Sequence, residues 1–339
     1  YRADLQGRVF ALFSAAWVVP SLIGPFLAGA VAEYLHWRWV FLGVAVLTVI
    51  AFILVASRLR GVDLSGTEQQ EPSRRVLGRV ALAIVVAALA VTLSLTGRVS
   101  KDFGATTGWL VAAATLVALA IAVRPLLPRG TLVARRGLPS VIVMRGLIAG
   151  TLFGAEVYVP LLLTSEYGFG PTMAGLALTV AAIAWAVAAE MQGRYGDRLG
   201  NERIAMIGLS LLAFATIVGA TTALLHLPAA VLITAWAFAG GGVGLMYPRL
   251  TVLTLAYSTK ENQGFNSAAL SISDSLGSSA AIALMGLIFI SLGSAQLAFG
   301  MVFVAATALA ALALVPGLRL TQVPEQPAAT RTVVVSDGT

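Results

Sequence analysis

"GRYGDRLGNER", residues 193–203, lies between two long apolar runs. These eleven residues include three glycines and five charged side chains, although only 11% of the whole chain is charged. The mean hydropathy is +0.91, whereas a soluble domain carries roughly 25% charged residues. Because such a chain cannot cover itself with polar surface, the cluster is predicted to be a short polar connection between membrane-spanning segments.

The apolar residues form ten blocks, each about as long as the hydrocarbon core of a bilayer requires. The blocks cover residues 9–32, 37–57, 77–96, 108–127, 139–164, 171–192, 204–225, 229–257, 265–291 and 295–317. Backbone groups in lipid must be hydrogen-bonded within the chain, which makes helices the default, and the runs lack the alternation of barrel strands. The sequence therefore predicts an all-α, polytopic membrane helix bundle with about ten transmembrane helices.

Basic residues alternate between the two sets of connections. One set contains Arg2, Arg8, Arg58, Arg60, Arg74, Arg75, Arg79, Arg129, Arg135, Arg136, Arg194, Arg198, Arg203, Lys260, Arg319 and Arg331, and the other contains Arg38, Arg98 and Lys101. The positive-inside rule places the richer set in the cytoplasm, so both chain ends are predicted to be cytoplasmic and the location to be the cell membrane. The net charge of +7 then reflects loops beside anionic lipid rather than nucleic-acid binding.

The opening cluster resembles the cytoplasmic loop signature of the major facilitator superfamily, Gly-x-x-x-Asp-Arg-x-Gly-Arg-Arg. In that family the signature joins the second and third helices of each six-helix half. Asn201 and Glu202 stand where basic residues are usual. The alternative is a tight turn with positive-inside arginines. The matching residues are Gly193, Asp197, Arg198, Gly200 and Arg203.

A second stretch, "WVVPSLIGPFLAGAVAEYLHWRWVFLGV" at residues 17–44, resembles the antiporter motif of drug:proton antiporters in this superfamily. That motif, Gly-x-x-x-Gly-Pro-x-x-Gly-Gly, lies on the fifth helix. Gly24, Pro25 and Gly29 match it, while Pro20 and Ala28 replace two glycines. Small residues allow close helix contacts and Pro25 permits a bend, so ordinary helix packing is the alternative.

The resemblance covers most of the chain and implies a major facilitator fold of the fourteen-span antiporter type, as a fragment without the first four helices. Residues 1–57 would hold the last two helices of the N-terminal bundle, and residues 139–320 the C-terminal six-helix bundle. Residues 58–138 would form a cytoplasmic linker with the two additional helices, packed outside the transport bundle. Residues 321–339, polar and containing proline, are predicted to be a disordered cytoplasmic tail.

Ionisable residues inside the predicted spans are the candidates for binding substrate or protons, because charge is costly in lipid. Arg145 and Glu156 share one helix face, roughly 16 Å apart, and Glu156 is expected to face a central cavity. The alternative is a buried Glu156 hydrogen-bonded to another helix. Asp274 lies among serines, with structural hydrogen bonding between helices as its alternative. Arg249 is expected to snorkel toward the membrane surface rather than to pair with an acid.

The resemblance implies a secondary active transporter that exports drugs or other amphipathic small molecules in exchange for protons, by alternating access. The fragment alone is not expected to transport. Uptake, or transport of a lipid or metabolite, is the alternative. An integral membrane enzyme is less favoured because the sequence shows no clustered catalytic set. The chain has no cysteine and two histidines, so we expect no metal and no cofactor. We expect a monomer whose partners are small molecules, protons and the bilayer.

The loop signature leads to one further expectation. In the superfamily, the loop of one half meets the cytoplasmic start of a helix in the other half. Asp197 is therefore expected to lie beside the backbone of residues 5–9 in the outward-open state, with Arg8 nearby. A carboxylate is stabilised there by the free N–H groups and partial positive charge of the helix N-terminus.

Overall fold

A computed structural model describes residues 20, 23–59 and 73–321. In this part of the chain every regular element is a helix, and nine helices are long and apolar enough to cross a membrane. The predicted all-α membrane bundle is confirmed. The first predicted span, 9–32, lies mostly outside the described residues, and its end continues as a helical segment over residues 23–34.

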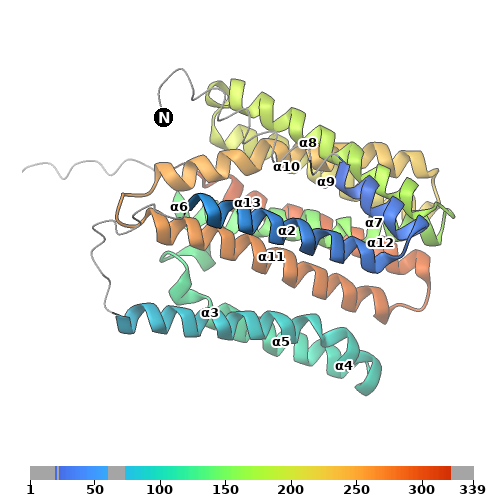
Figure 1. Cartoon of the computed structure of the whole chain (residues 1–339), viewed down its shortest axis with the longest axis horizontal. Coiled ribbons are helices and arrows are strands. Elements are labelled where there is room, and N and C mark those ends of the chain that lie inside the picture. Colours follow the sequence, from blue (N-terminus) through green and yellow to red (C-terminus); the bar gives the residue numbers. More distant parts are fainter. Residues whose placement is uncertain (1–19, 21–22, 60–72, 322–339) are drawn as a thin grey trace, which may run out of the picture.

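The long helices run side by side along the long axis of the molecule (Figure 1). Their bounds in the N-terminal and middle parts are α2 Trp37–Leu59, α3 Ser73–Ser94, α4 Thr96–Phe103, α5 Ala105–Ala122, α6 Leu138–Glu156 and α7 Tyr158–Ser165. The remaining helices are α8 Pro171–Leu199, α9 Asn201–Leu225, α10 Ala229–Ala256, α11 Gln263–Ser291, α12 Ala295–Leu312 and α13 Leu314–Gly317. Two short 3₁₀ turns, Arg124–Leu126 and Thr131–Val133, connect α5 to α6.

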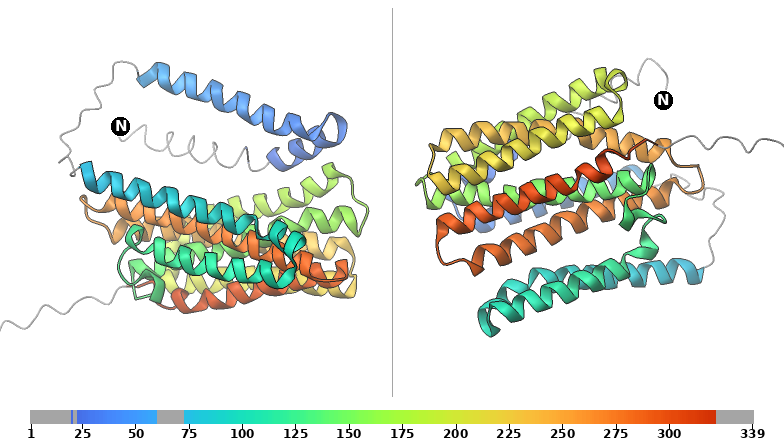
Figure 2. Two further views of the ribbon diagram at one scale, coloured as in Figure 1. Left: turned by 90° about the horizontal axis from the view of Figure 1, so that it is seen from below. Right: turned by 180° about the vertical axis from the view of Figure 1, so that it is seen from behind.

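The core lies among the helices from α6 to α12. α10 packs on both α8 and α9, α9 packs on α12, and α6 packs on α11 and α12 (Figure 2). Trp236, Phe299 and Phe303 are among its largest fully buried side chains. Gly240 and Gly244 bring α10 against the backbone of α8, because a side chain at either position would overlap it. Close packing is what small residues provide between helices in lipid, where the hydrophobic effect does not drive association.

α3, α4 and α5 lie together along α11, at the edge of the molecule (Figure 1). Their contacts with the six-helix bundle are made mainly to α11. Between the two additional predicted spans, residues 96–103 form the short helix α4, which ends at Phe103 and is followed by Gly104. The expected packing of these helices outside the transport bundle and the division of the chain into four parts stay predictions.

The predicted span 139–164 is interrupted at Val157, where α6 ends and α7 begins. Proline has no backbone N–H, so Pro160 cannot donate to the carbonyl of Glu156 four residues earlier. The interruption therefore falls where the helical hydrogen-bond ladder loses a donor. It places Glu156 at the last position of α6.

Connections alternate between two ends of the bundle, as predicted. At one end, which carries most of the arginines, residues 318–321 form a segment that we call the C-terminal strap. The backbone N–H of Gly137 donates to the Arg319 carbonyl at 2.8 Å, and the Tyr257 hydroxyl to the Leu320 carbonyl at 3.0 Å. Leu320 is buried beneath these contacts. We call this the basic end; which side of the membrane it faces stays a prediction.

Candidate functional site

Arg145 on α6 and Asp274 on α11 form an ion pair inside the bundle. The Arg145 Nε lies 2.6 Å from the Asp274 Oδ1, and the two side chains are 16% and 27% exposed. The guanidinium also donates to the Tyr247 carbonyl at 3.3 Å, and its central carbon lies 3.4 Å from the centroid of the Tyr247 ring. A cation over an aromatic face is attracted by the ring's negative face. Three helices therefore hold this guanidinium in place.

The approach of α6 and α11 is fixed one turn away from the pair. The Ser273 hydroxyl donates to the Ile142 carbonyl at 2.7 Å, so the helices are joined beside Asp274. The sequence treated Arg145 and Asp274 as separate candidates, and the structure brings them together. Of the two possibilities stated for Asp274, a cavity face and a contact between helices, both are present at this point.

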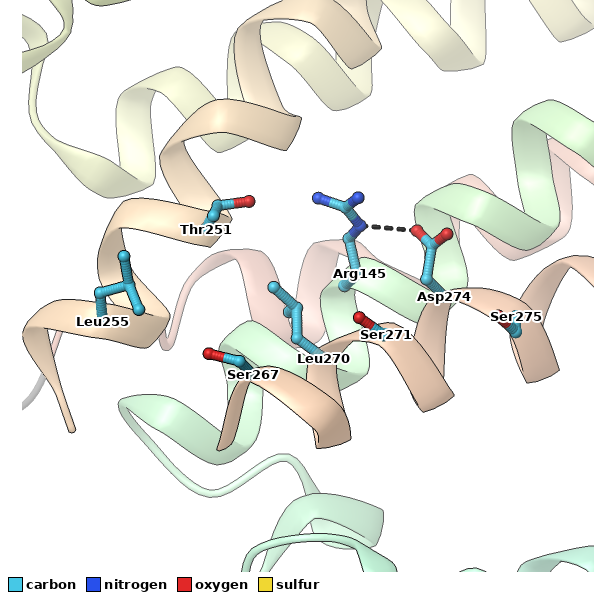
Figure 3. A pocket seen from close by; sticks show the side chains of 8 residues that line it. All are labelled: Arg145, Thr251, Leu255, Ser267, Leu270, Ser271, Asp274 and Ser275. Atoms are coloured by element: carbon cyan, nitrogen blue, oxygen red, sulfur yellow. Dashed lines mark hydrogen bonds and ion pairs between the residues drawn. The ribbon is translucent and has the colours of Figure 1, made fainter. Parts of the chain in front are cut away.

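A cavity of about 260 Å³ opens beside the ion pair (Figure 3). Its walls come from α10 and α11 together with Arg145, and four hydroxyl-bearing residues contribute to them. Three of those hydroxyls repeat every fourth residue on α11, which places them on one helix face. The guanidinium and the carboxylate cancel in charge, so the cavity is polar and close to neutral. The lining residues are Arg145, Thr251, Leu255, Ser267, Leu270, Ser271, Asp274 and Ser275.

Glu156 lies apart from this cavity and does not line it. It is half-buried at the end of α6, and among the described residues it forms no ion pair. Its polar neighbour is Trp236, a fully buried side chain whose indole N–H is close to the carboxyl but makes no hydrogen bond with it. The expectation that Glu156 faces a central cavity stays a prediction.

Tyr247 connects the ion pair to the neighbouring helix α8. Its ring packs edge-on against Trp185, with centroids 5.1 Å apart. Its buried hydroxyl has no hydrogen-bond partner within the described residues. A tyrosine that stacks on a guanidinium from another helix has no local sequence signal, because the partner lies about a hundred residues away.

At the basic end, the predicted loop 193–203 is almost entirely helical. α8 runs to Leu199 and α9 starts at Asn201, so Gly200 alone separates them. Gly200 has φ +81°, a left-handed conformation that glycine adopts without strain. The loop prediction was wrong because hydropathy marks where a helix leaves the lipid, and α8 continues beyond that point. A side chain added at Gly193 would meet no other described atom.

Arg249 pairs with an acid, contrary to the expected snorkelling. Its terminal nitrogen lies 2.6 Å from the Asp197 Oδ1, and its Nε donates to the Asn201 side-chain oxygen at 2.7 Å. Glu202 accepts a hydrogen bond from the backbone N–H of Thr321 at 3.1 Å. The two departures from the loop signature, Asn201 and Glu202, therefore each have a partner within this bundle.

The other loop residues make weaker contacts. The Arg198 guanidinium lies 6.0 Å from the Tyr195 ring centroid, and Arg203 is exposed. The predicted contact between Asp197 and residues 5–9 lies outside the described residues.

The segment 23–34, which carries the Gly-Pro motif, packs against the start of α8. A side chain at Gly29 would overlap the backbone of Pro171 and Thr172, and one at Gly175 would overlap the backbone of Pro25. Pro20 is exposed, and a side chain at Gly24 would meet no other described atom. Among the described residues, the close packing at this motif is made by Pro25 and Gly29.

The family model described as Major Facilitator Superfamily matches residues 1–155 and 141–335. The chain belongs to the major facilitator superfamily. It is 24% identical to the multidrug transporter protein MdtP of Bacillus subtilis over 84% of this chain and 52% of MdtP. It is 29% identical to the probable multidrug-efflux transporter Rv1634 of Mycobacterium tuberculosis over 74% of this chain and 54% of that protein. The chain thus spans about half the length of these relatives.

Solved major facilitator structures share the fold. A peptide transporter POT in complex with sulfate superposes with a TM-score of 0.58 at 16% identity, covering 94% of this chain and 70% of that chain. A POT family transporter in complex with 5-aminolevulinic acid gives a TM-score of 0.62 at 13% identity, covering 95% of this chain and 71% of that chain. At this identity the likeness concerns the fold alone. The relatives and the structural neighbours are transporters.

Proposed function

We propose that the protein is a secondary active transporter that exports drugs or other amphipathic small molecules in exchange for protons, by alternating access. Membership of the major facilitator superfamily and the multidrug transporters among its relatives support export. The observation that carries proton exchange is the contrast between two carboxyls of one bundle: Asp274 has a guanidinium partner and Glu156 has none. This contrast, drawn from the described residues, supports proton exchange at Glu156 rather than at Asp274.

Asp274 is the less suited of the two carboxyls to exchange protons. Protonating it would leave the Arg145 guanidinium without its counter-charge in a partly buried place, and an uncompensated charge there is strongly unfavourable. Glu156 leaves no charge behind when it is neutralised. Either a proton or the cationic group of a substrate can neutralise it.

Competition at Glu156 would couple the two fluxes. If a proton and a substrate cation neutralise the same carboxylate, only one of them binds at a time. Release of one on each side of the membrane then permits binding of the other, which is the condition for exchange. Alternating access between two halves around a midplane site supplies the two sides.

The cavity in Figure 3 favours a second candidate, transport of a small polar metabolite. Its hydroxyls and its neutral ion pair offer hydrogen bonds to a polar ligand. In this reading Arg145 and the serines of α11 would orient the ligand. The two candidates differ in which substitutions abolish transport: Glu156 for a cationic drug, and the α11 serines for a polar metabolite.

The test uses the full-length protein in proteoliposomes with an imposed pH gradient and a fluorescent lipophilic cation as probe. Glu156→Gln should lower gradient-driven transport by at least about tenfold, as expected when a required proton carrier is removed. Glu190→Gln is the matched control, since Glu190 is an exposed glutamate of the same bundle, paired with Arg194. Transport by Glu156→Gln at the rate of the control would contradict the assignment.

A further inference from the structure

The N-terminus of α8 has no cap from its own chain neighbours. Gly170 occupies the position before the helix and offers no side chain, and Pro171 is the first helical residue. A helix leaves its first backbone N–H groups without intrahelical partners, and a side-chain oxygen normally accepts from one of them. The N–H of Thr172 is one of these unpaired donors.

Glu33 supplies the missing acceptor from another helix. Its Oε2 accepts a hydrogen bond from the backbone N–H of Thr172 at 2.9 Å and another from the Thr172 hydroxyl at 2.5 Å. The two residues are 139 positions apart in sequence. Glu33 belongs to segment 23–34, which lies outside the six-helix bundle, so the cap crosses the contact between two separate parts of the molecule.

The surrounding glycines leave room for this contact. Gly170 lies beside the Glu33 carboxylate, where a side chain would press on both oxygens. Gly29 and Gly175 bring the two backbones together one and two turns further along. The carboxylate therefore sits at the open edge of a closely packed helix crossing, at the end opposite the C-terminal strap.

We propose that Glu33 caps α8 from a different part of the same chain. It stabilises the first turn of α8 only while segment 23–34 is docked on that helix. Separation of the two parts at this end would then remove the cap and expose unpaired N–H groups of α8. The contact thus biases the protein toward the state that is closed at this end. This inference rests on the proposed alternating access, because it requires that the two parts separate in the transport cycle.

The bias is measurable as a shift in populations. A cap of this kind, with a carboxylate near a helix N-terminus, changes the equilibrium between docked and separated states by roughly 2- to 10-fold. Glu33→Ala should produce this shift in favour of separation. Glu33→Gln keeps one oxygen acceptor and loses the charge, so an intermediate shift is expected.

The experiment measures a distance across the contact in the full-length protein. The 339 residues contain no cysteine, so cysteines introduced at the exposed Leu35 and Leu225 give two labelling sites at this end. Spin labels there report the docked and separated populations by pulsed electron paramagnetic resonance. Thr172→Val should shift the populations in the same direction as Glu33→Ala, and Thr172→Ser should restore the wild-type distribution.

A double variant separates a shared contact from two independent effects. If Glu33 and Thr172 act through one contact, Thr172→Val adds little to Glu33→Ala. Glu261→Ala is the matched control, because Glu261 is also an exposed glutamate but lies in the connection between α10 and α11. A wild-type distribution in Glu33→Ala, a fully additive double variant, or an equal shift in Glu261→Ala would each overturn the proposal. Transport by the same variants is measured separately, so a loss of proton coupling is not mistaken for a loss of the cap.

Discussion

Asp274 and Glu156 are carboxyls in the same six-helix bundle, yet their surroundings differ. Asp274 is held by the Arg145 guanidinium, which is itself held by Tyr247. Glu156 ends α6 beside an indole N–H that makes no hydrogen bond to it. The difference shows that two ionisable residues in spans can have unlike electrostatic surroundings. Neutralising Asp274 would leave the Arg145 charge without its partner, whereas neutralising Glu156 would leave no such charge among the described residues.

The largest effect is expected from breaking the ion pair on one side. Arg145→Leu leaves Asp274 without its partner, and we expect a loss of about 2 kcal/mol in the free energy of unfolding, since the pair is partly exposed. The double variant Arg145→Leu/Asp274→Leu should recover a good part of that loss. Denaturant unfolding in one detergent measures all three proteins. Equal losses in the single and double variants would show that the pair is not the cause.

A second, smaller effect tests whether the partners of a charged side chain also determine its contribution to stability at the basic end. Arg249 has two partners and is mostly buried, whereas the Arg194–Glu190 pair is exposed on both sides. Arg249→Ala should lower the free energy of unfolding by about 1 kcal/mol. Arg194→Ala, the control, should change it by less than about 0.5 kcal/mol. Similar losses in the free energy of unfolding in Arg249→Ala and Arg194→Ala would contradict the expected difference between a mostly buried arginine and an exposed one.

Glu33 extends the comparison to a carboxylate that has hydrogen bonds but, among the described residues, no ion-pair partner. The side-chain and backbone hydrogen bonds from Thr172 lower the pKa of Glu33 below its ordinary value of 4.5. The contribution of Glu33 to docking should be complete above pH 4.5. It should be lost as the pH falls through the lowered pKa that Glu33 has in the docked state. Tyr34 is the other ionisable group of segment 23–34, His36 and Arg38 follow the segment, and α8 has none before Glu190.

The measurement for Glu33 is the docked population of the spin-labelled protein as a function of pH. Glu166 and Tyr167 precede α8 and are the remaining ionisable groups of this connection. Glu33→Gln should flatten the acid side of the curve, and Glu166→Gln, the control, should leave it unchanged. A curve that is identical in Glu33→Gln and wild type would contradict the assignment.

The smallest change in stability is expected at Glu156 itself. Glu156→Gln removes a charge that has no partner among the described residues, so the free energy of unfolding should change by less than about 0.5 kcal/mol. Asp274→Asn, which removes a paired charge, should lower it more. Parallel unfolding curves check both. A larger loss at Glu156 than at Asp274 would reverse the comparison.

Much of the fold was predictable from the sequence, because span length and charge alternation follow from the bilayer alone. The break near Val157 also had a local signal in Pro160, although hydropathy averages over it. The extension of α8 to Leu199 had no local signal, because a helix that leaves the lipid keeps its hydrogen bonds while its hydropathy falls.

The site was predictable as a list of residues and not as a set of contacts. Charge inside a span marks Arg145, Glu156, Asp274 and Arg249 as costly and therefore as candidates. Which of them pair depends on how helices far apart in sequence cross. The Arg145–Asp274 pair spans 129 positions and Glu33–Thr172 spans 139, and no local pattern reports such distances.

The contacts of the C-terminal strap determine when part of the basic end can form during protein synthesis. Residues 318–321 lie after the last long helix, yet they hydrogen-bond the connection before α6 through Gly137, the start of α9 through Glu202 and the end of α10 through Tyr257. Helices emerge from the ribosome in order, so these three partners are made long before the strap. These hydrogen bonds can therefore form only after the ribosome has translated residue 321, and in a nascent chain arrested before that point their partners in the bundle would be left to water.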